Sequence, residues 1–276
     1  MSGGKNAPAA MNCGWSAAVK YDMMVSMEKR DDDFHVHEKL KSNQPEPSVP
    51  APEPAPAWRI WQAFIVLPIA IVVSALPFML YSHSANQVGV NMISLLLQDG
   101  CFIILPLLLV SVIYKQPPEV MGFRRFSAGQ VFRLAIPAGI AFYLINVAVA
   151  VLINLFFPGR IDQSQTAIAL LTMAGNQFEL IMLLVFFTTL APVAEEIYFR
   201  AFIYPPLRQA MGRRAAIAFS AAMFALIHVN FWTFLPLFAG GLGFAWLYDR
   251  YRNIWLNIIA HMTWNIIVLI LYFNFA

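Results

Sequence analysis

From Trp58 to Ala276 the chain consists mainly of apolar runs long enough to cross a lipid bilayer. A helix of about 20 residues spans the roughly 30 Å of hydrocarbon in a membrane. Helices are favoured because backbone N–H and C=O groups in lipid must be satisfied within the spanning segment. Pro205-Pro206 indicates a break between the fourth helix and the fifth. We therefore predict an all-α, polytopic membrane bundle of about seven transmembrane helices, at 58–82, 91–114, 132–157, 178–204, 215–231, 233–248 and 254–275.

Composition supports this fold class. Hydrophobic residues make up 59% of the chain and charged residues 12%, whereas soluble domains have roughly 45–50% and 25%. These values exclude a soluble globular enzyme, a disordered chain and a nucleic-acid binder. The net charge of +3 is too small to imply an anionic partner. We expect the lipid bilayer to surround most of the chain.

Residues 1–57 differ from the rest of the chain. They are polar, and residues 44–56 hold six prolines in thirteen positions. Proline fixes φ and lacks an N–H, so this stretch is expected to be an extended polyproline II spacer. We predict a disordered cytoplasmic segment at 1–57, followed by the helical bundle at 58–276. A cytoplasmic partner that docks on residues 1–57 is an open alternative to a plain tether.

The basic residues predict the orientation in the membrane. If residues 1–57 are cytoplasmic, seven helices place every Lys and Arg except Arg160 on the cytoplasmic side. The C-terminus then lies outside. An uncleaved first helix and the lack of organelle targeting suit a bacterial cytoplasmic (inner) membrane. A re-entrant segment at 164–177 and the oligomeric state stay open.

Ionisable residues within the predicted helices indicate function, because a charge at bilayer depth costs at least a few kcal/mol. Glu196 and Arg200 are four residues apart, on one helix face, and are predicted to form a structural ion pair. Glu195 is rotated by about 100° from Glu196 and has no such partner. A carboxylate of this kind is a candidate general base or acid. The alternative is that both glutamates form packing salt bridges with other helices.

Polar residues on two further helices extend this candidate site. The fifth predicted helix carries His228, and the seventh carries His261 and Asn265, four apart and on one face. An imidazole and an amide on one face make a pair of hydrogen-bond donors. The alternative is interhelical bonding, worth about 0.6 kcal/mol per bond. Asp99 is a weaker candidate, expected to partner a polar group of another helix.

Three short motifs occur in order, EExxxR at 195–200, FxxxH at 224–228 and HxxxN at 261–265. Together, in membrane helices, they resemble the CPBP family of intramembrane endopeptidases, also called the Abi or CAAX-protease-like family. That family includes the CAAX proteases of eukaryotes and bacterial proteins linked to bacteriocin self-immunity. The resemblance covers about residues 178–270. Ala201 stands where the family often has glycine.

The resemblance implies a site that hydrolyses a peptide bond of a membrane-associated peptide or protein. Glu195 would activate the attacking water, and His228 would share that water. His261 and Asn265 would stabilise the oxyanion of the tetrahedral intermediate, and the predicted ion pair would be structural. Such roles suit the chemistry, because hydrolysis needs a base for water and donors where negative charge develops.

Alternatives remain for the cofactor and for the function class. No cofactor is expected, and the alternative is Zn²⁺ held by Glu195, His228 and His261 with one position left for water. A non-catalytic membrane scaffold or bacteriocin-immunity binding protein would tolerate Glu195→Ala, whereas a protease would not. A transporter would more often show internal repeats, and the sequence has none that we detect. Whether a substrate would be prenylated is not readable from the sequence.

Overall fold

The computed structural model describes residue 26 and residues 55–81, 83, 84, 86–160 and 166–275. In these residues all regular structure is helical, which confirms the predicted all-α class. Residues 1–57, predicted to be disordered, lie outside the described residues except for Ser26 and 55–57. The helices are α2 Ile60–Tyr81, α3 Gln87–Leu107, η1 Leu108–Ile113, η2 Pro118–Met121, α4 Ala128–Gln130, η3 Val131–Ala135, α5 Ile136–Phe156, α6 Thr166–Met173, α7 Gln177–Val185, η4 Phe186–Leu190, α8 Ala191–Glu196, η5 Ile197–Ile203, α9 Tyr204–Leu226, α10 Phe231–Tyr251 and α11 Ile254–Phe275.

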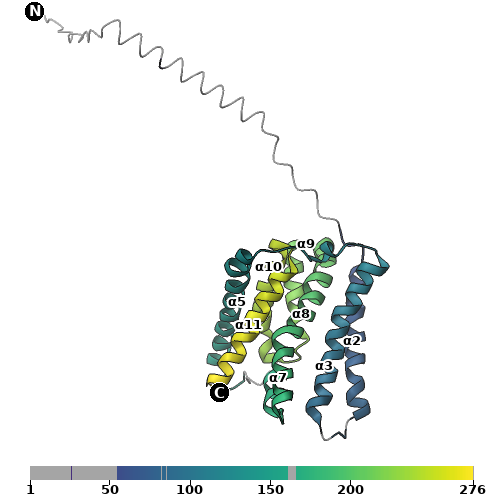
Figure 1. The fold of residues 1–276 in the computed structure, drawn as a ribbon. Coiled ribbons are helices and arrows are strands. Elements are labelled where there is room, and N and C mark those ends of the chain that lie inside the picture. Colours follow the sequence, from purple (N-terminus) through teal and green to yellow (C-terminus); the bar gives the residue numbers. More distant parts are fainter. Residues whose placement is uncertain (1–25, 27–54, 82, 85, 161–165, 276) are drawn as a thin grey trace, which may run out of the picture. The chain divides into compact units, whose positions relative to one another are not determined.

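Six of the described helical stretches are long and apolar enough to cross a membrane. They are Ile60–Tyr81, Gln87–Ile113, Ala128–Phe156, Gln177–Leu226, Phe231–Tyr251 and Ile254–Asn274. The fourth stretch has 50 residues and joins the helices predicted at 178–204 and 215–231. The prediction of about seven helices therefore fits, with the fourth and fifth counted as one. The start of α2 and the end of α11 lie at opposite ends of the bundle (Figure 1).

The break between the fourth and fifth predicted helices lies at Gly212 and not at Pro205-Pro206. Gly212 has φ 77° and ψ 173°, a backbone conformation that favours glycine. The helix continues through the prolines, and a side chain from outside this helix bonds to one of the carbonyl groups that a proline leaves without an N–H partner. The carbonyl of Phe202 faces residue 206 in α-helical register, and it accepts a hydrogen bond from Trp58 Nε1 at 2.8 Å instead.

The segment left open at 164–177 contains α6, which has eight residues. A helix of this length is about 12 Å long and cannot cross the bilayer by itself. It is followed by α7, whose N-cap Asn176 accepts a hydrogen bond from the backbone N–H of Glu179. The long helical stretch that carries the candidate site therefore begins with a capped end at residue 177.

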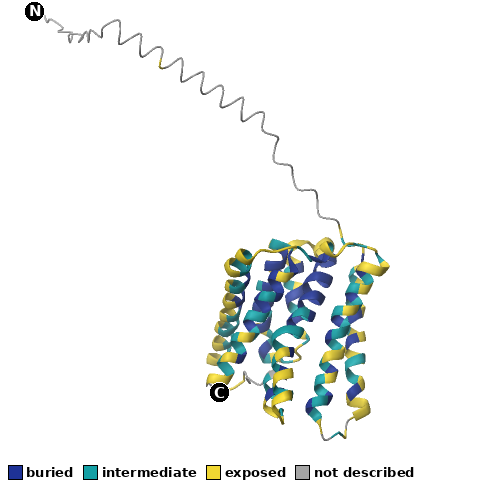
Figure 2. Ribbon diagram, viewed as in Figure 1, coloured by how far each residue is buried: buried dark blue, intermediate teal, exposed yellow. Residues whose placement is uncertain are grey.

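Buried side chains gather on the helices that carry the three motifs (Figure 2). Every residue from Ile197 to Tyr204 is buried. The paired helices α2 and α3 pack against each other, and α3 contacts α8 and η5. On the other side, α5 packs against α10 and α11. The glutamates of α8 are thus enclosed by neighbouring helices, which gives them a fixed position within an apolar bundle.

Close approach of α5 to α11 depends on Gly139. A Cβ added there would overlap the backbone oxygen of Ala260, which cannot move without shifting α11. We expect Gly139→Ala to lower the free energy of unfolding by about 1–3 kcal/mol, because overpacking forces the two backbones apart. Gly100→Ala is the matched control, since a Cβ at Gly100 meets nothing within 4 Å. Denaturant unfolding in detergent measures both, and equal stabilities would contradict the prediction.

Candidate functional site

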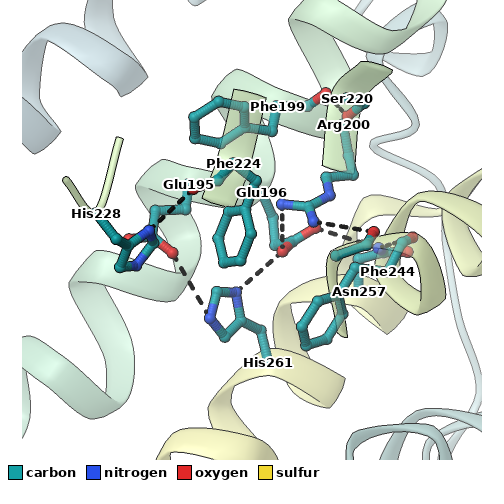
Figure 3. A network of polar contacts seen from close by, with 11 residues as sticks. Glu195, Glu196, Phe199, Arg200, Ser220, Phe224, His228, Phe244, Asn257 and His261 are labelled. Atoms are coloured by element: carbon teal, nitrogen blue, oxygen red, sulfur yellow. Dashed lines mark hydrogen bonds and ion pairs between the residues drawn. The ribbon is translucent and has the colours of Figure 1, made fainter. Parts of the chain in front are cut away.

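Glu196 is the centre of the polar network inside the bundle (Figure 3). Its Oε1 lies 3.1 Å from Arg200 Nη1, and neither side chain is exposed. The same oxygen lies 2.9 Å from His261 Nδ1, on α11. The second oxygen accepts a hydrogen bond from Asn257 Nδ2 at 3.2 Å. One buried carboxylate therefore ties together α8, η5 and α11.

Aromatic rings enclose the guanidinium group of Arg200. Its Cζ lies 4.6 Å from the ring centre of Phe224, 5.4 Å from that of Phe244 and 5.9 Å from that of Phe199. Its Nη2 donates to the backbone oxygen of Gly241 at 3.4 Å. Ring faces attract cations, and the attraction is stronger away from water. The charge of Arg200 is therefore balanced by one carboxylate and three aromatic rings.

Glu195 points away from Glu196 and towards the other nitrogen of His261. Its Oε2 lies 3.6 Å from His261 Nε2, and its side chain is 17% exposed. The imidazole thus lies between the two glutamates, with Nδ1 on Glu196 and Nε2 facing Glu195 (Figure 3). A hydrogen bond to one ring nitrogen fixes the orientation of the other. Glu196 therefore sets the direction in which His261 presents Nε2.

His228 lies on the Glu195 side of the network, away from Arg200 (Figure 3). Its Nδ1 lies 2.9 Å from the backbone oxygen of Phe224, which leaves Nε2 for another partner. It interacts electrostatically with His261, but among the described residues no hydrogen bond or ion pair joins it to Glu195. His228 is exposed, whereas His261 is buried. His228 therefore lies beside the network, at the surface of the bundle.

Asn265 is not part of this network. Its Nδ2 donates to the backbone oxygen of Phe187, in η4, at 2.8 Å. The Phe187 oxygen can accept this bond because its own helix offers it no N–H donor. In the π-helical register of η4 its donor would be residue 192, which is a proline without an N–H. One N–H of the Asn265 amide is thus used to complete the backbone of the helix that carries the glutamates.

Replacing Asn265 tests this backbone contact. We expect Asn265→Ala to lower the free energy of unfolding by about 1–3 kcal/mol, because the Phe187 oxygen loses its partner. Asn274→Ala is the control, since Asn274 is exposed and its one side-chain hydrogen bond among the described residues is to Ile270 of its own helix. Unfolding in detergent compares the two variants. Unchanged stability together with lost hydrolysis would contradict a backbone role and leave the role in oxyanion binding.

Two buried polar residues lie beside the network. The sequence analysis did not identify Asn257, and it gave Asp99 as a weaker candidate. Asn257 donates to Glu196 and to the backbone oxygen of Phe244, and its position four residues before His261 was a usable signal. Asp99 on α3 is buried and interacts electrostatically with Glu195. Its Oδ2 has no hydrogen-bond partner in the described part of the chain.

The zinc alternative depends on which ring nitrogens of His228 and His261 are already bonded. Within the described ranges, no three His, Cys, Asp or Glu side chains are placed to hold a metal ion together. The nitrogen of His261 nearest Glu196 is engaged by that carboxylate, and Nδ1 of His228 is engaged by a backbone oxygen. Nε2 of both histidines has no hydrogen bond among the described residues, and metal-binding histidines commonly have their other ring nitrogen bonded in this way. The set of Glu195, His228 and His261 therefore stays an alternative, and we derive no step through a metal.

Comparison with known proteins supports the resemblance seen in the motifs. Residues 177–267 match the family model Rce1-like, described as type II CAAX prenyl endopeptidase Rce1-like. A curated protein of Bacillus subtilis (strain 168), named "Putative membrane peptidase YdiL", is 31% identical over 90 residues. The aligned segment covers 33% of this chain and 37% of that protein. No solved structure matches the chain significantly.

These matches fall on the segment that contains all three motifs. It runs from the start of α7 into α11 and includes Glu195, His228 and His261. The resemblance predicted from the sequence is thereby confirmed: residues 177–267 are similar to the Rce1-like CAAX endopeptidases.

Proposed function

We propose that this protein is an intramembrane endopeptidase that hydrolyses a peptide bond of a membrane-associated peptide or protein. One observation carries the proposal. Glu195, a carboxylate without a hydrogen-bond partner among the described residues, faces His261 Nε2 at 3.6 Å inside a bundle of membrane-spanning helices. A base and a potential donor that face one space are the minimum for attack by water on a carbonyl.

In the proposed reaction Glu195 removes a proton from water while the water oxygen attacks the carbonyl carbon of the scissile bond. His228, which is exposed on the Glu195 side of the network, hydrogen-bonds the same water. The carbonyl oxygen becomes an oxyanion, to which His261 donates from a protonated ring and Asn265 from its second amide N–H. Breakdown returns the proton to the leaving nitrogen.

Glu196 and Arg200 are proposed to position these groups and not to touch the substrate. Glu196 holds His261 by Nδ1, and Arg200 balances the charge of Glu196. Both side chains are fully buried, so neither can meet a peptide that enters from the surface. Their proposed function is to keep Nε2 of His261 directed at the reacting centre.

The proposed cell location follows the charge pattern of the sequence. The protein would lie in a bacterial cytoplasmic membrane, with residues 1–57 in the cytoplasm and the C-terminus outside. A cysteine-labelling reagent that cannot cross membranes tests this. Labelling of a cysteine introduced after Phe275 in intact cells, without labelling of Cys13, is the expected result.

A cleavage assay tests the proposed activity. The detergent-purified protein is incubated with a library of quenched fluorescent peptides or with a membrane proteome. Wild type is compared with Glu195→Ala and His228→Ala, each with and without chelator. We expect cleavage by wild type, its loss in both variants, and no effect of chelator.

The chelator comparison and a cellular test distinguish the zinc enzyme and the non-catalytic scaffold from the proposed function. Loss of cleavage with chelator would favour zinc held by Glu195, His228 and His261. A cellular phenotype that Glu195→Ala restores as well as wild type does would instead support a non-catalytic scaffold. Circular dichroism of each variant ensures that a lost activity is not a lost fold.

A further inference from the structure

A second cluster of charged side chains lies where α9 bends and α10 ends. Asp249 is buried and accepts hydrogen bonds from Arg213 Nε and from the Tyr204 hydroxyl at 2.6 Å. It also forms an ion pair with Arg208, whose Nε lies 2.7 Å from Oδ1. Arg252 Nη2 lies 3.8 Å from the same carboxylate. We call these five residues the Asp249 cluster. Three arginines minus one aspartate leave it with two positive charges in excess.

The carboxylate holds two of these arginines by the inner edge of their guanidinium groups. Arg208 and Arg213 each use Nε, one on each oxygen of Asp249, so both pairs of Nη groups remain. The side chains of Arg208 and Arg213 are 43% and 50% exposed, whereas that of Asp249 is 4% exposed. Because both guanidinium groups contact the same carboxylate, they lie close to each other. Their outer edges therefore offer adjacent N–H donors at the surface.

The bend at Gly212 makes this pairing possible. In an unbroken helix, Arg213 would point about 140° away from Arg208 around the helix axis, so the two side chains would lie on different faces. The positive φ of 77° at Gly212 turns the chain between them, and both arginines reach Asp249. The backbone conformation at Gly212 thus determines the arrangement of the two arginines around Asp249.

The position of the cluster along the helices suits a contact with lipid headgroups. It is at an end of the spanning helices, since α10 ends at Tyr251 and α11 begins at Ile254. Met211, between the two arginines in the sequence, has an exposed apolar side chain. Basic side chains at such helix ends bind anionic headgroups, and the arginine fork matches two oxygens of a phosphate.

We propose that the outer edges of Arg208 and Arg213 bind a phosphate group at the membrane surface, and that Asp249 positions them for it. The phosphate comes either from an anionic lipid headgroup or from free phosphate. The proposal does not depend on the proposed hydrolytic site, because none of the cluster residues belongs to the network around Glu196.

Binding of short-chain lipid to protein in uncharged detergent tests the proposal. Wild type is titrated with dioctanoyl phosphatidylglycerol, with dioctanoyl phosphatidylcholine and with inorganic phosphate. We expect the affinity for phosphatidylglycerol to fall about tenfold or more in Arg208→Gln/Arg213→Gln, since charged hydrogen bonds are lost. The control, Arg214→Gln/Arg250→Gln, removes the same charge at the same end and should change it little. An equal fall in both variants would overturn the proposal.

The ligands identify the source of the phosphate. Binding of phosphatidylglycerol without binding of inorganic phosphate assigns the site to a lipid headgroup. Equal binding of inorganic phosphate assigns it to free phosphate, and either result supports the site. Equal affinities for phosphatidylglycerol and phosphatidylcholine, with no binding of inorganic phosphate, would overturn it.

Asp249→Asn distinguishes a positioned pair of arginines from simple attraction between charges. The substitution makes the cluster more positive by one charge but weakens the contacts that hold Arg208 and Arg213 in place. A positioned site should bind phosphatidylglycerol more weakly in this variant, whereas simple attraction would make binding tighter. Tighter binding would therefore count against the proposal.

A measurement on wild type alone does not depend on the folding of any variant. Phenylglyoxal modifies exposed arginines, and peptide mass spectrometry gives the rate at each one. Phosphatidylglycerol should slow modification of Arg208 and Arg213 severalfold relative to phosphatidylcholine, with Arg214 and Arg250 little changed. Equal protection of all four arginines would overturn the proposal.

Discussion

Replacing Glu195 with glutamine should lower kcat/KM for peptide cleavage by about 10² to 10⁴, because the amide has the shape of the carboxylate but cannot take a proton from water. Stability should change little. Glu195 makes no hydrogen bond in the described residues, and its contact with His261 is 3.6 Å long. The measurement is the rate of cleavage of an identified peptide by purified protein.

A matched control for this substitution lies on the same helical stretch. Glu179→Gln makes the same chemical change on the first turn of α7, where the side chain accepts a hydrogen bond from the backbone N–H of Gly175 and from no other described residue. It should cleave at the wild-type rate. Wild-type cleavage by Glu195→Gln as well would show that this carboxylate is not the base, whatever the other residues do.

Replacing Arg200 with alanine should lower the free energy of unfolding by about 3–5 kcal/mol, because it leaves the carboxylate of Glu196 buried without its counter-charge. It also removes the cation held among the rings of Phe199, Phe224 and Phe244. Denaturant unfolding in detergent measures the effect. Arg214→Ala, which is exposed at the end of the bundle, is the control and should unfold like wild type.

A double substitution separates the cost of an unpaired charge from the value of the pair. Glu196→Gln/Arg200→Met removes both charges at similar volume and should be more stable than Arg200→Ala. It should nonetheless cleave poorly, because the amide introduced at position 196 would not hold His261 as the carboxylate does. A double variant as unstable as the single one would mean that the aromatic contacts of Arg200, not its charge, hold the bundle together.

The fold class could be predicted from the sequence because an apolar segment of about 20 residues that crosses a bilayer forms a helix. Apolar runs of about 20 residues gave helices close to those found, such as 254–275 against Ile254–Phe275. The break near residue 205 was misplaced for a physical reason. Proline loses a backbone bond, but the indole of Trp58, far away in sequence, supplies a bond to Phe202. Expectations drawn from neighbouring residues cannot identify a donor that is distant in sequence.

Contacts of the candidate site could be predicted from the sequence only where both residues lie on the same helix. The spacing of Glu196 and Arg200 is visible in the sequence, and they lie 3.1 Å apart. Contacts between helices were not readable. Nothing in the spacing indicates that His261 would bond Glu196 and face Glu195, or that Asn265 would bond Phe187. These contacts depend on how α11 packs against α8 and η4, which tertiary packing decides.

The π-helical turns on both sides of the glutamates have a consequence for how this chain tolerates changes in length. A wide turn of this kind amounts to one residue added to an α-helix. Deleting one residue from Ile197–Ile203 would therefore restore an ordinary helix without breaking it. The part of the helix before the deletion would rotate by about 100° relative to the part after it. Glu195 and Glu196 would then no longer face their present partners, although the helix itself would remain intact. The number of residues between the glutamates and Tyr204 is thus as much a requirement of this site as their identity.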